Sequence, residues 1–361
     1  MRKAASGVIV APALRDLSVL AAQLADWLQP RLEGATDLRV VNLAYPRGAG
    51  QSHETILFDA FWREGRRERW RGMVVRIKPT RFRVYQDDMF HEQFRVMQVL
   101  HARRVAPIAE PFWYEADPAL LGAPFFVMAK CEGRVAVTIP PYMQQGWVVE
   151  ATPRQRARLW EDSVRTLAAL QRAPLADLGF LHRPGAAPGF DQEWDRYRRY
   201  LTWISERRPW PFLEAAWARL DARRPANRPP GLVWGDARLG NMMVGDDFRI
   251  VAVMDWEQTS LGGALQDLGW WLFSEAGHMS QARQAADGFG SRQDTIELWQ
   301  EVTGISAADV EWYEAFAGFK IASLLIRLIT LRGGELPPVG PVDHRIWRDL
   351  ARRLDIDWPG T

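Results

Sequence analysis

Cysteine is almost absent from this sequence, because Cys131 is the only one in 361 residues. A single cysteine excludes an intramolecular disulfide and a zinc site built from cysteines, and it fits a reducing compartment. The sequence also has no uninterrupted apolar run of about 18 residues, the length that a membrane-spanning helix needs. A short apolar run near the start follows two basic residues, but it leads into an amphipathic pattern, unlike a signal peptide. We therefore expect a soluble, cytoplasmic protein without a membrane partner.

An excess of charge of one sign is missing as well. Lysine and arginine number 46 while aspartate and glutamate number 44, so no net field attracts nucleic acid. The arginine clusters at 63–71 and 196–200 are interpreted as a solvated hairpin turn and as one face of a helix. The six histidines include no pair at metal-ligand spacing on a helix. We expect no nucleic-acid partner.

The order of apolar patterns predicts two lobes. The first part of the chain shows in turn a helix, three strands, a helix and a strand, over residues 14–32, 38–46, 54–62, 71–79, 87–104 and 124–130. Later patterns are mostly helical, as in 152–173, where Thr152 is an N-cap followed by proline. The sequence thus predicts an α+β fold with a small, strand-rich N-terminal lobe over 1–130 and a larger helical C-terminal lobe over 131–361.

Polar residues that could take part in catalysis or bind a metal concentrate in the segment LVWGDARLGNMMV, residues 232–244. It places Asp236 and Asn241 five residues apart, directly after an apolar run. The chain continues with a hairpin signal around GDDF and then with MDWE, which contains Asp255. Because a hairpin returns the chain to its start, the three residues can converge, and their carboxylate and amide oxygens are hard ligands that suit Mg²⁺. As ordinary turn residues, glycine, aspartate and asparagine would need no further explanation.

An aspartate, four residues and an asparagine resemble the catalytic loop of protein kinases and of the aminoglycoside phosphotransferase-like small-molecule kinases. The sequence MDWE is similar to the metal-binding segment of the latter family, and the resemblance covers nearly the whole chain after its first helix. Residues 255–271 and 309–322 resemble the bacterial branch related to the N-terminal kinase domain of long acyl-CoA dehydrogenases. The resemblance implies a protein-kinase-like two-lobed fold and an ATP- and Mg²⁺-dependent phosphotransferase that acts on a small hydroxylated molecule.

The same resemblance implies roles for individual residues. Asp236 is expected to accept or orient the proton of the acceptor hydroxyl, and Asn241 and Asp255 are expected to hold Mg²⁺. The family usually has a histidine two residues before the catalytic aspartate. Here Trp234 takes that place, and a packed tryptophan can position the loop instead. Asp267 matches a family aspartate that usually braces the catalytic loop, and the alternative is an ordinary charge at a helix N-terminus.

ATP is expected in the N-terminal lobe. The loop RGAGQSHET, residues 47–55, lies between two predicted strands, where a phosphate-covering loop belongs. Gly48 and Gly50 let the backbone approach phosphate oxygens there, and Ser52 can donate a hydrogen bond. As a bare turn, the same loop would need no ligand.

Two cations on one strand compete for the contact to the ATP phosphates. Arg76 and Lys78 are two residues apart, so their side chains face the same side. The run VRIK resembles the kinase sequence V-A-I-K, which favours Lys78. Small-molecule kinases often have V-L-R here, which favours Arg76, and we prefer Arg76.

Two further contacts to ATP are expected from position in the sequence. On the following helix, Gln93 stands where the family glutamate normally sits, so a neutral hydrogen bond would replace an ion pair. The segment FFVMAKCEG, residues 125–133, resembles the hinge between the lobes. Met128 and Lys130 are therefore expected beside the adenine.

The later helices predict the class of acceptor. Aminoglycosides are polycations and need several carboxylates in their site. The helices after the metal segment carry single acidic residues and many aromatic ones, namely Trp270, Trp271, Phe273, Trp299, Trp312, Tyr313, Phe316 and Phe319. The helical spacing of many of these residues predicts that they belong to the core. However, the 18 tryptophans of the chain are more than core packing needs, and small-molecule sites are largely apolar. We expect an apolar hydroxylated or hydroxyacyl acceptor.

Three other functions stay open. An aminoglycoside phosphotransferase is the alternative acceptor class. The residues Trp234 and Gln93 leave room for a nucleotide-binding pseudokinase that acts as an interaction module. A metal phosphohydrolase built on Asp236, Asp255 and Glu257 would leave the glycine loop and the strand cations unused. A protein kinase is disfavoured because the chain lacks an A-P-E type segment.

Overall fold

The computed structural model describes residues 15–46, 54–80, 82–138, 140–183, 185, 189–282, 287–331 and 345–357. The chain divides into two compact units, which comprise Met1–Val84 with Ala109–Cys131 and Tyr85–Ile108 with Glu132–Thr361. The first unit holds an antiparallel sheet and a helix, and the second is mostly helical. The predicted α+β fold is therefore confirmed.

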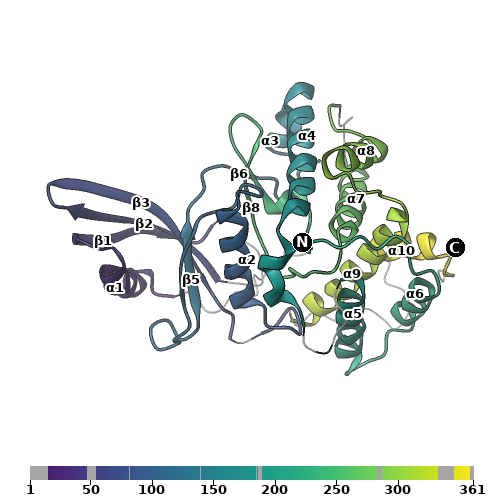
Figure 1. Ribbon diagram of the computed structural model, residues 1–361, viewed down its shortest axis with the longest axis horizontal. Coiled ribbons are helices and arrows are strands. Elements are labelled where there is room, and N and C mark those ends of the chain that lie inside the picture. Colours follow the sequence, from purple (N-terminus) through teal and green to yellow (C-terminus); the bar gives the residue numbers. More distant parts are fainter. Residues whose placement is uncertain are drawn as a thin grey trace, which may run out of the picture. The chain divides into compact units, whose positions relative to one another are not determined.

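The first unit is built on a five-stranded antiparallel sheet with the strand order β1-β2-β3-β5-β4 (Figure 1). Its strands are β1, Ala35–Ala44; β2, Glu54–Glu64; β3, Arg67–Ile77; β4, Pro111–Glu115; and β5, Phe125–Ala129. Strands β2 and β3 pair without interruption from Glu54 opposite Ile77 to Glu64 opposite Arg67. Their turn contains Gly65 at a φ of +59°, a left-handed conformation that glycine adopts without strain. The charged segment between the second and third predicted strands is thus the end of a hairpin.

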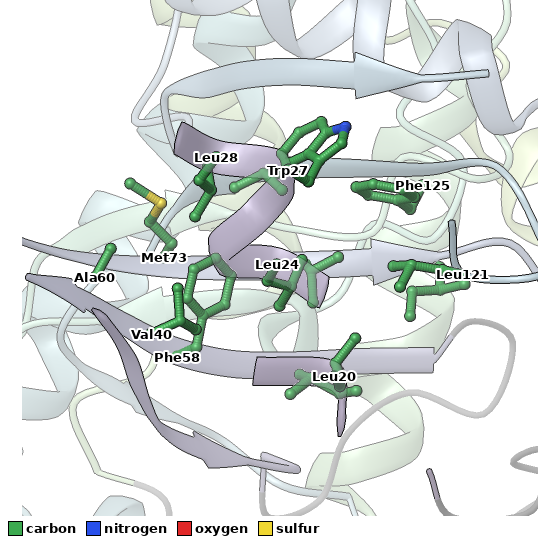
Figure 2. Packing of buried hydrophobic residues seen from close by; sticks show 14 of the residues in the cluster. Leu20, Leu24, Trp27, Leu28, Val40, Phe58, Ala60, Met73, Leu121 and Phe125 are labelled. Atoms are coloured by element: carbon green, nitrogen blue, oxygen red, sulfur yellow. The ribbon is translucent and has the colours of Figure 1, made fainter. Parts of the chain in front are cut away.

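Helix α1, Leu17–Leu28, packs on one face of this sheet, and Asp16 caps its N-terminus. Figure 2 shows the apolar side chains that meet there, and the buried cluster includes Leu20, Leu24, Trp27, Leu28, Val40, Ile56, Phe58 and Phe125. Val75 and Ile77 of β3 belong to the same cluster. Because side chains alternate along a strand, Arg76 points to the other face of the sheet.

The second unit contains most of the helices. In its described residues these are α2, Phe90–Ala102; α3, Trp147–Glu150; α4, Pro153–Ala169; α5, Phe190–Ser205; α6, Pro211–Ala222; α7, Leu265–Met279; α8, Arg292–Thr303; α9, Val310–Leu331; and α10, Arg345–Leu354. A small antiparallel sheet has the order β6-β7-β8, formed by Arg134–Val135, Met242–Val244 and Ile250–Val253. Thr152 caps α4 in a reciprocal capping box with Gln155, as the sequence pattern predicts. Within the described ranges, no helix has both the length and the apolar character for crossing a bilayer.

Helix α2 groups with the second unit, whereas the sequence interpretation placed it in the N-terminal lobe. It packs beside the 3₁₀ helix η3, Leu175–Leu181. Arg103 forms an ion pair with Asp177 at 2.6 Å, and the Arg95 guanidinium lies 3.8 Å from the centre of the Phe180 ring. These contacts join segments far apart in sequence, which periodicity alone does not reveal.

Aromatic side chains fill the core of the second unit. The rings of Trp194 and Trp217 stack with centroids 3.7 Å apart, and Phe316 lies 5.5 Å from Trp194. The aromatic residues expected to contribute to an acceptor pocket are buried to within 5% exposure, namely Trp270, Trp271, Phe273, Trp299, Tyr313, Phe316 and Phe319. The ring of Trp312 contacts Phe316 at 5.1 Å. Core packing therefore accounts for these residues.

Candidate active site

The backbone before Asp236 has a shape that requires glycine. Gly235 has a φ of +102°, and a Cβ atom there would lie 2.4 Å from the Cβ atom of Gln258. Just before it, the N–H groups of Val233 and Ser260 each donate to the other residue's carbonyl, at 2.8 and 3.1 Å. The chain therefore turns tightly against this segment and places Asp236 directly after the turn.

Trp234 links this loop to the segment that contains Asp255. Its indole Nε1 donates to the carbonyl of Met254 at 2.7 Å and to that of Asp255 at 3.1 Å. The Trp234 ring is fully buried and lies 6.0 Å from the ring of Trp256. The tryptophan at the family's histidine position thus makes polar contacts of its own, in addition to packing.

A buried carboxylate holds the backbone of the same loop. Asp267 lies in the first turn of α7 and is 1% exposed. Its Oδ2 accepts from the N–H of Trp234 at 2.6 Å, and its Oδ1 accepts from the N–H of Gly235 at 2.8 Å. Burial raises the pKa of Asp267 to about 6, although the two backbone donors lower it. At neutral pH the carboxylate is mostly ionised, and each oxygen has a backbone donor.

The variant Asp267→Ala is expected to destabilise the protein and to slow turnover. It leaves two buried N–H groups without an acceptor, at a cost of about 2 to 6 kcal/mol in the free energy of unfolding. Urea unfolding measures this loss. The control Glu297→Ala removes an exposed carboxylate on α8 and is expected to stay within about 0.5 kcal/mol of the parent. An Asp267→Ala variant as stable as the parent would remove the bracing role.

Two donors orient the carboxylate of Asp236. The Nδ2 atom of Asn241 donates to Oδ2 of Asp236 at 2.6 Å and to its backbone carbonyl at 3.0 Å. The Nε atom of Arg238 lies 3.1 and 3.0 Å from the two carboxylate oxygens. Burial lowers the pKa of Arg238, but the charges of Asp236 and Asp255 raise it more, so its pKa lies above the usual value. Asp236 is therefore held by an amide and by a guanidinium that stays charged.

The predicted hairpin is present and brings Asp255 next to Asn241. Asn241 ends the 3₁₀ helix η4, Leu239–Asn241, and strands β7 and β8 follow it. After β8, the N–H of Met254 donates to the carbonyl of Asn241 at 2.9 Å. Asp255 has a φ of +64°, a conformation that is uncommon for residues other than glycine and that clusters at functional sites.

The oxygen atoms of Asn241 and Asp255 suit Mg²⁺. Since Nδ2 of Asn241 donates to Asp236, its Oδ1 is the atom that can serve as a ligand. In the part of the chain that the structure describes, no group of three or more histidine, cysteine, aspartate or glutamate side chains could hold a metal ion. A magnesium site here would therefore need phosphate and water oxygens to complete its coordination, as Mg²⁺ commonly does.

Comparisons with known proteins bear on this geometry. The model of the phosphotransferase enzyme family (APH) matches residues 53–304, which is more than half of the chain. The chain belongs to the phosphotransferase enzyme family. The phosphotransferase is also 25% identical over 298 residues to the probable acyl-CoA dehydrogenase IBR3 of Arabidopsis thaliana, a match that covers 77% of this chain and 35% of the relative. The chain thus spans about a third of the length of that curated relative.

Solved structures share the fold of this phosphotransferase. A putative aminoglycoside phosphotransferase from Ralstonia eutropha JMP134 aligns with a TM-score of 0.64 at 23% identity, over 92% of this chain and 94% of that chain. A thermostable mutant of the aminoglycoside phosphotransferase APH(4)-Ia, in ternary complex with AMP-PNP and hygromycin B, aligns with a TM-score of 0.51 at 13% identity. That match covers 94% of this chain and 100% of the other. At these identities the likeness shows the fold alone.

Arg238 is a residue of this phosphotransferase loop that the sequence analysis did not single out. It lies two positions after Asp236 and has an extended backbone, with φ −150° and ψ 154°. Its guanidinium reaches back to the carboxylate of Asp236. The sequence could have indicated Arg238, because it places a cation two residues after the predicted catalytic aspartate.

In the first unit, two predicted ATP contacts share one sheet face. Arg76 pairs with Phe126 across β3 and β5, and Val74 pairs with Met128. Because residues two apart on a strand face the same side, Arg76 and Met128 lie on one face. Lys78 lies one residue past the end of β3. The choice between Arg76 and Lys78 stays a prediction.

The remaining predicted ATP contacts fall in different places. The backbone N–H of Lys130 donates to the carbonyl of Gly72 at 3.0 Å, and its Nζ lies 3.7 Å from Oδ1 of Asp59. Gln93 is buried on α2, in the second unit. Gly48, Gly50 and Ser52 lie outside the described residues. Their roles in ATP binding stay predictions.

A second polar cluster lies within electrostatic reach of Arg238. The hydroxyl of Tyr142 donates to Oε1 of Glu275 at 2.9 Å, and the Tyr142 ring lies 4.7 Å from that of His278. Burial raises the pKa of Glu275 to about 7, while the hydrogen bond from Tyr142 lowers it. Burial and the charges of Arg238 and Arg345 lower the pKa of His278 to about 4. This cluster contains a carboxyl group that titrates near neutral pH.

Glu275 is expected to make the stability of the protein depend on pH. Its pKa rises from 4.5 to about 7 on folding, so the folded state binds more protons between these values. The stabilisation is fully present below about pH 4.5 and is lost as the pH rises through about 7. The variant Glu275→Gln cannot titrate, and urea unfolding should show that it loses less stability than the parent between about pH 5 and about pH 8. Equal losses in the two proteins would contradict this assignment.

Proposed function

We propose that the chain is an ATP- and Mg²⁺-dependent phosphotransferase that phosphorylates a hydroxyl group of a small molecule. The observation that supports it most is the hydrogen-bonded set of Asp236, Asn241 and Arg238, with Asp255 tied to the same loop through Trp234. This set combines an oriented carboxylate, two oxygen ligands and a cation. These are the groups that phosphoryl transfer requires, because its catalysis depends on positioning and on charge stabilisation.

In this proposal Asp236 is the catalytic residue. Its carboxylate accepts the hydrogen bond of the acceptor hydroxyl and takes up the proton as the new bond to phosphorus forms. Asn241 and Arg238 keep that carboxylate in one orientation. We propose that the guanidinium of Arg238, which stays charged, also stabilises negative charge on the transferred phosphoryl group.

The nucleotide is proposed to be ATP, which fits the AMP-PNP complex of the APH(4)-Ia mutant. Mg²⁺ held by Oδ1 of Asn241 and the carboxylate of Asp255 would neutralise phosphate charge. The other proposed contacts to ATP are Arg76 or Lys78 and the loop residues Gly48, Gly50 and Ser52 at the phosphates, Gln93 as the partner of the cation, and Met128 and Lys130 at the adenine.

The acceptor is proposed to be an apolar hydroxylated or hydroxyacyl compound. The guanidinium of Arg238 contacts Asp236 and offsets the charge of its carboxylate. A polycationic aminoglycoside needs several carboxylates in its site to offset the desolvation of its ammonium groups. The likeness to IBR3, which is described as a probable acyl-CoA dehydrogenase, favours an acyl group in the acceptor.

A panel of acceptors tests the proposal. The protein is assayed with Mg-ATP and hydroxyacyl compounds, lipophilic alcohols or kanamycin-type aminoglycosides, and ADP release is measured. We expect release with the first two classes, and none when Mg²⁺ is omitted. Efficient phosphorylation of aminoglycosides with no reaction of any apolar alcohol would overturn the acceptor class. Nucleotide binding without turnover on the whole panel would favour the pseudokinase alternative.

A further inference from the structure

A lysine lies in the helical core of the second unit. Lys320, on α9, is only 3% exposed. Its Nζ donates to Oε1 of Glu193 at 3.0 Å and to Oε1 of Gln266 at 2.8 Å, and it lies 4.6 Å from the centre of the Tyr197 ring. A buried ammonium group is costly unless it is paired and hydrogen-bonded, and packing alone would be served better by an apolar side chain.

The first acceptor of Lys320 is connected to the segment before the catalytic loop. Oε2 of Glu193 accepts from the hydroxyl of Ser260 at 2.8 Å. The backbone of Ser260 is paired in both directions with that of Val233, as described above. Glu193 therefore joins Lys320 to the residue that fixes the start of the loop.

The second acceptor leads to the carboxylate that holds the loop. Gln266 is followed on α7 by Asp267, whose two oxygens accept from the N–H groups of Trp234 and Gly235. The charge of Lys320 acts on Asp267 and lowers its pKa, against the larger effect of burial, which raises it. Lys320 is thus coupled to the loop from two sides, by hydrogen bonds and by its charge.

The charges of this cluster are balanced. Lys320 and Arg196 are the cations, Glu193 and Asp267 are the carboxylates, and none of the four is more than 7% exposed. Burial raises the pKa of Glu193, but the charges of Lys320 and Arg196 outweigh it, so this pKa lies below its usual value. The groups that act on Arg196 and Tyr197 from other segments include Tyr85, Asp87 and Asp236. Removal of Lys320 leaves a buried carboxylate without its cation.

We propose that Lys320 is a positioning residue for the catalytic loop. Its ammonium group balances Glu193 and Asp267, so Asp267 stays ionised and both of its oxygens keep their backbone donors. Lys320 acts through these residues, and no direct contact to the reacting atoms is part of the proposal. Because the inference rests on the function proposed above, its first test needs no catalysis.

That test is urea unfolding of the full chain and of the variant Lys320→Met between about pH 5 and about pH 8. Methionine keeps an unbranched side chain and removes the charge. In the parent, folding raises the pKa of Asp267 from 3.8 to about 6. The stabilisation from this proton is fully present below about pH 3.8 and is lost as the pH rises through about 6.

Without the cation, the folded variant keeps a proton on the cluster up to a higher pH than the parent does. Its stability therefore continues to fall where that of the parent has levelled, and its deficit in the urea midpoint should widen as the pH rises above about 6. Glu275 titrates in both proteins and cancels from the comparison. A deficit of equal size at every pH would overturn the proposal, because lost packing alone does not depend on pH.

The double variant Lys320→Met/Glu193→Gln guards against misfolding of the single one. It removes the two opposite charges that act on Asp267, so the deficit should no longer widen with pH, and the midpoint at pH 8 should exceed that of Lys320→Met. A double variant no more stable there than the single one would overturn the charge-balancing role. The control Arg198→Met removes a cation paired with Glu214 at the surface and should unfold as the parent does at each pH.

The pH dependence of ADP release tests the link to the loop. For Lys320→Met we expect the acid limb of kcat to move to higher pH by at least about one unit, which is a tenfold loss of kcat below the limb. KM for ATP should stay as in the parent, and the double variant should restore the limb. A widening midpoint deficit with an unmoved limb would overturn the positioning role and leave the phosphotransferase proposal standing. No turnover of any acceptor by the parent would instead overturn the proposed function, and the unfolding measurements would then decide the role of the Lys320 charge.

Discussion

The variant Asp236→Asn is expected to lose phosphoryl transfer almost completely while nucleotide binding stays nearly unchanged. In the proposed mechanism the Asp236 carboxylate takes the proton of the acceptor hydroxyl, and an amide cannot do so at neutral pH. We therefore expect kcat to fall by about 10² to 10⁴-fold. The nucleotide affinity should persist because the proposed contacts to ATP are made by other residues. Turnover is measured as ADP release and nucleotide affinity by calorimetry on the same preparation.

The matched control for this variant is Asp246→Asn. Asp246 lies in the exposed turn between β7 and β8, so the control removes the same charge away from the loop. It should leave both kcat and nucleotide affinity as in the parent. An unchanged kcat in Asp236→Asn would remove Asp236 from the mechanism. Loss of nucleotide binding together with turnover would instead indicate that the variant had lost its structure.

The variant Asp255→Ala is expected to abolish Mg²⁺-dependent nucleotide binding more completely than Asn241→Ala. A carboxylate contributes a full negative charge to the metal, whereas an amide contributes only a dipole. Asn241→Ala should also lower kcat, because Nδ2 of Asn241 orients the Asp236 carboxylate. Calorimetric titration of each variant with ATP, in the presence and absence of Mg²⁺, measures the metal-dependent part of the affinity.

The backbone at Asp255 calls for one more variant. Its φ of +64° is tolerated by aspartate and asparagine better than by alanine, so Asp255→Ala combines a lost charge with added strain. Asp255→Asn keeps the shape and removes only the charge. It should lose most of the Mg²⁺-dependent affinity while it unfolds at nearly the same urea concentration as the parent. If Asn241→Ala loses more of this affinity than either Asp255 variant, the assignment of metal ligands is wrong.

Several elements of the fold could be predicted because their signals lie in neighbouring residues. Thr152 followed by proline marks the start of α4, and the turn residues of GDDF mark the hairpin of β7 and β8. That hairpin is short, so it leaves the chain little freedom in where it returns. For this reason the approach of Asp255 to Asn241 could be predicted as well.

The sequence by itself thus determined the α+β class, the hairpins and the convergence of the loop around Asp236 with the segment after it. The tertiary structure alone decided which distant residues support them. The two interpretations of Asp267, a brace for the loop and a charge at a helix N-terminus, both place this residue in the first turn of α7. The packing of α7 decides between them, because both carboxylate oxygens of Asp267 accept from the loop backbone. The aromatic residues of α7 to α9 have helical spacing whether they line a core or a pocket, and their burial assigns them to the core. Arg196 and Gln258 are 62 residues apart, and no local pattern pairs them. Periodicity and turn signals depend on adjacent residues, whereas burial, shared charges and unsatisfied donors depend on how separate elements pack.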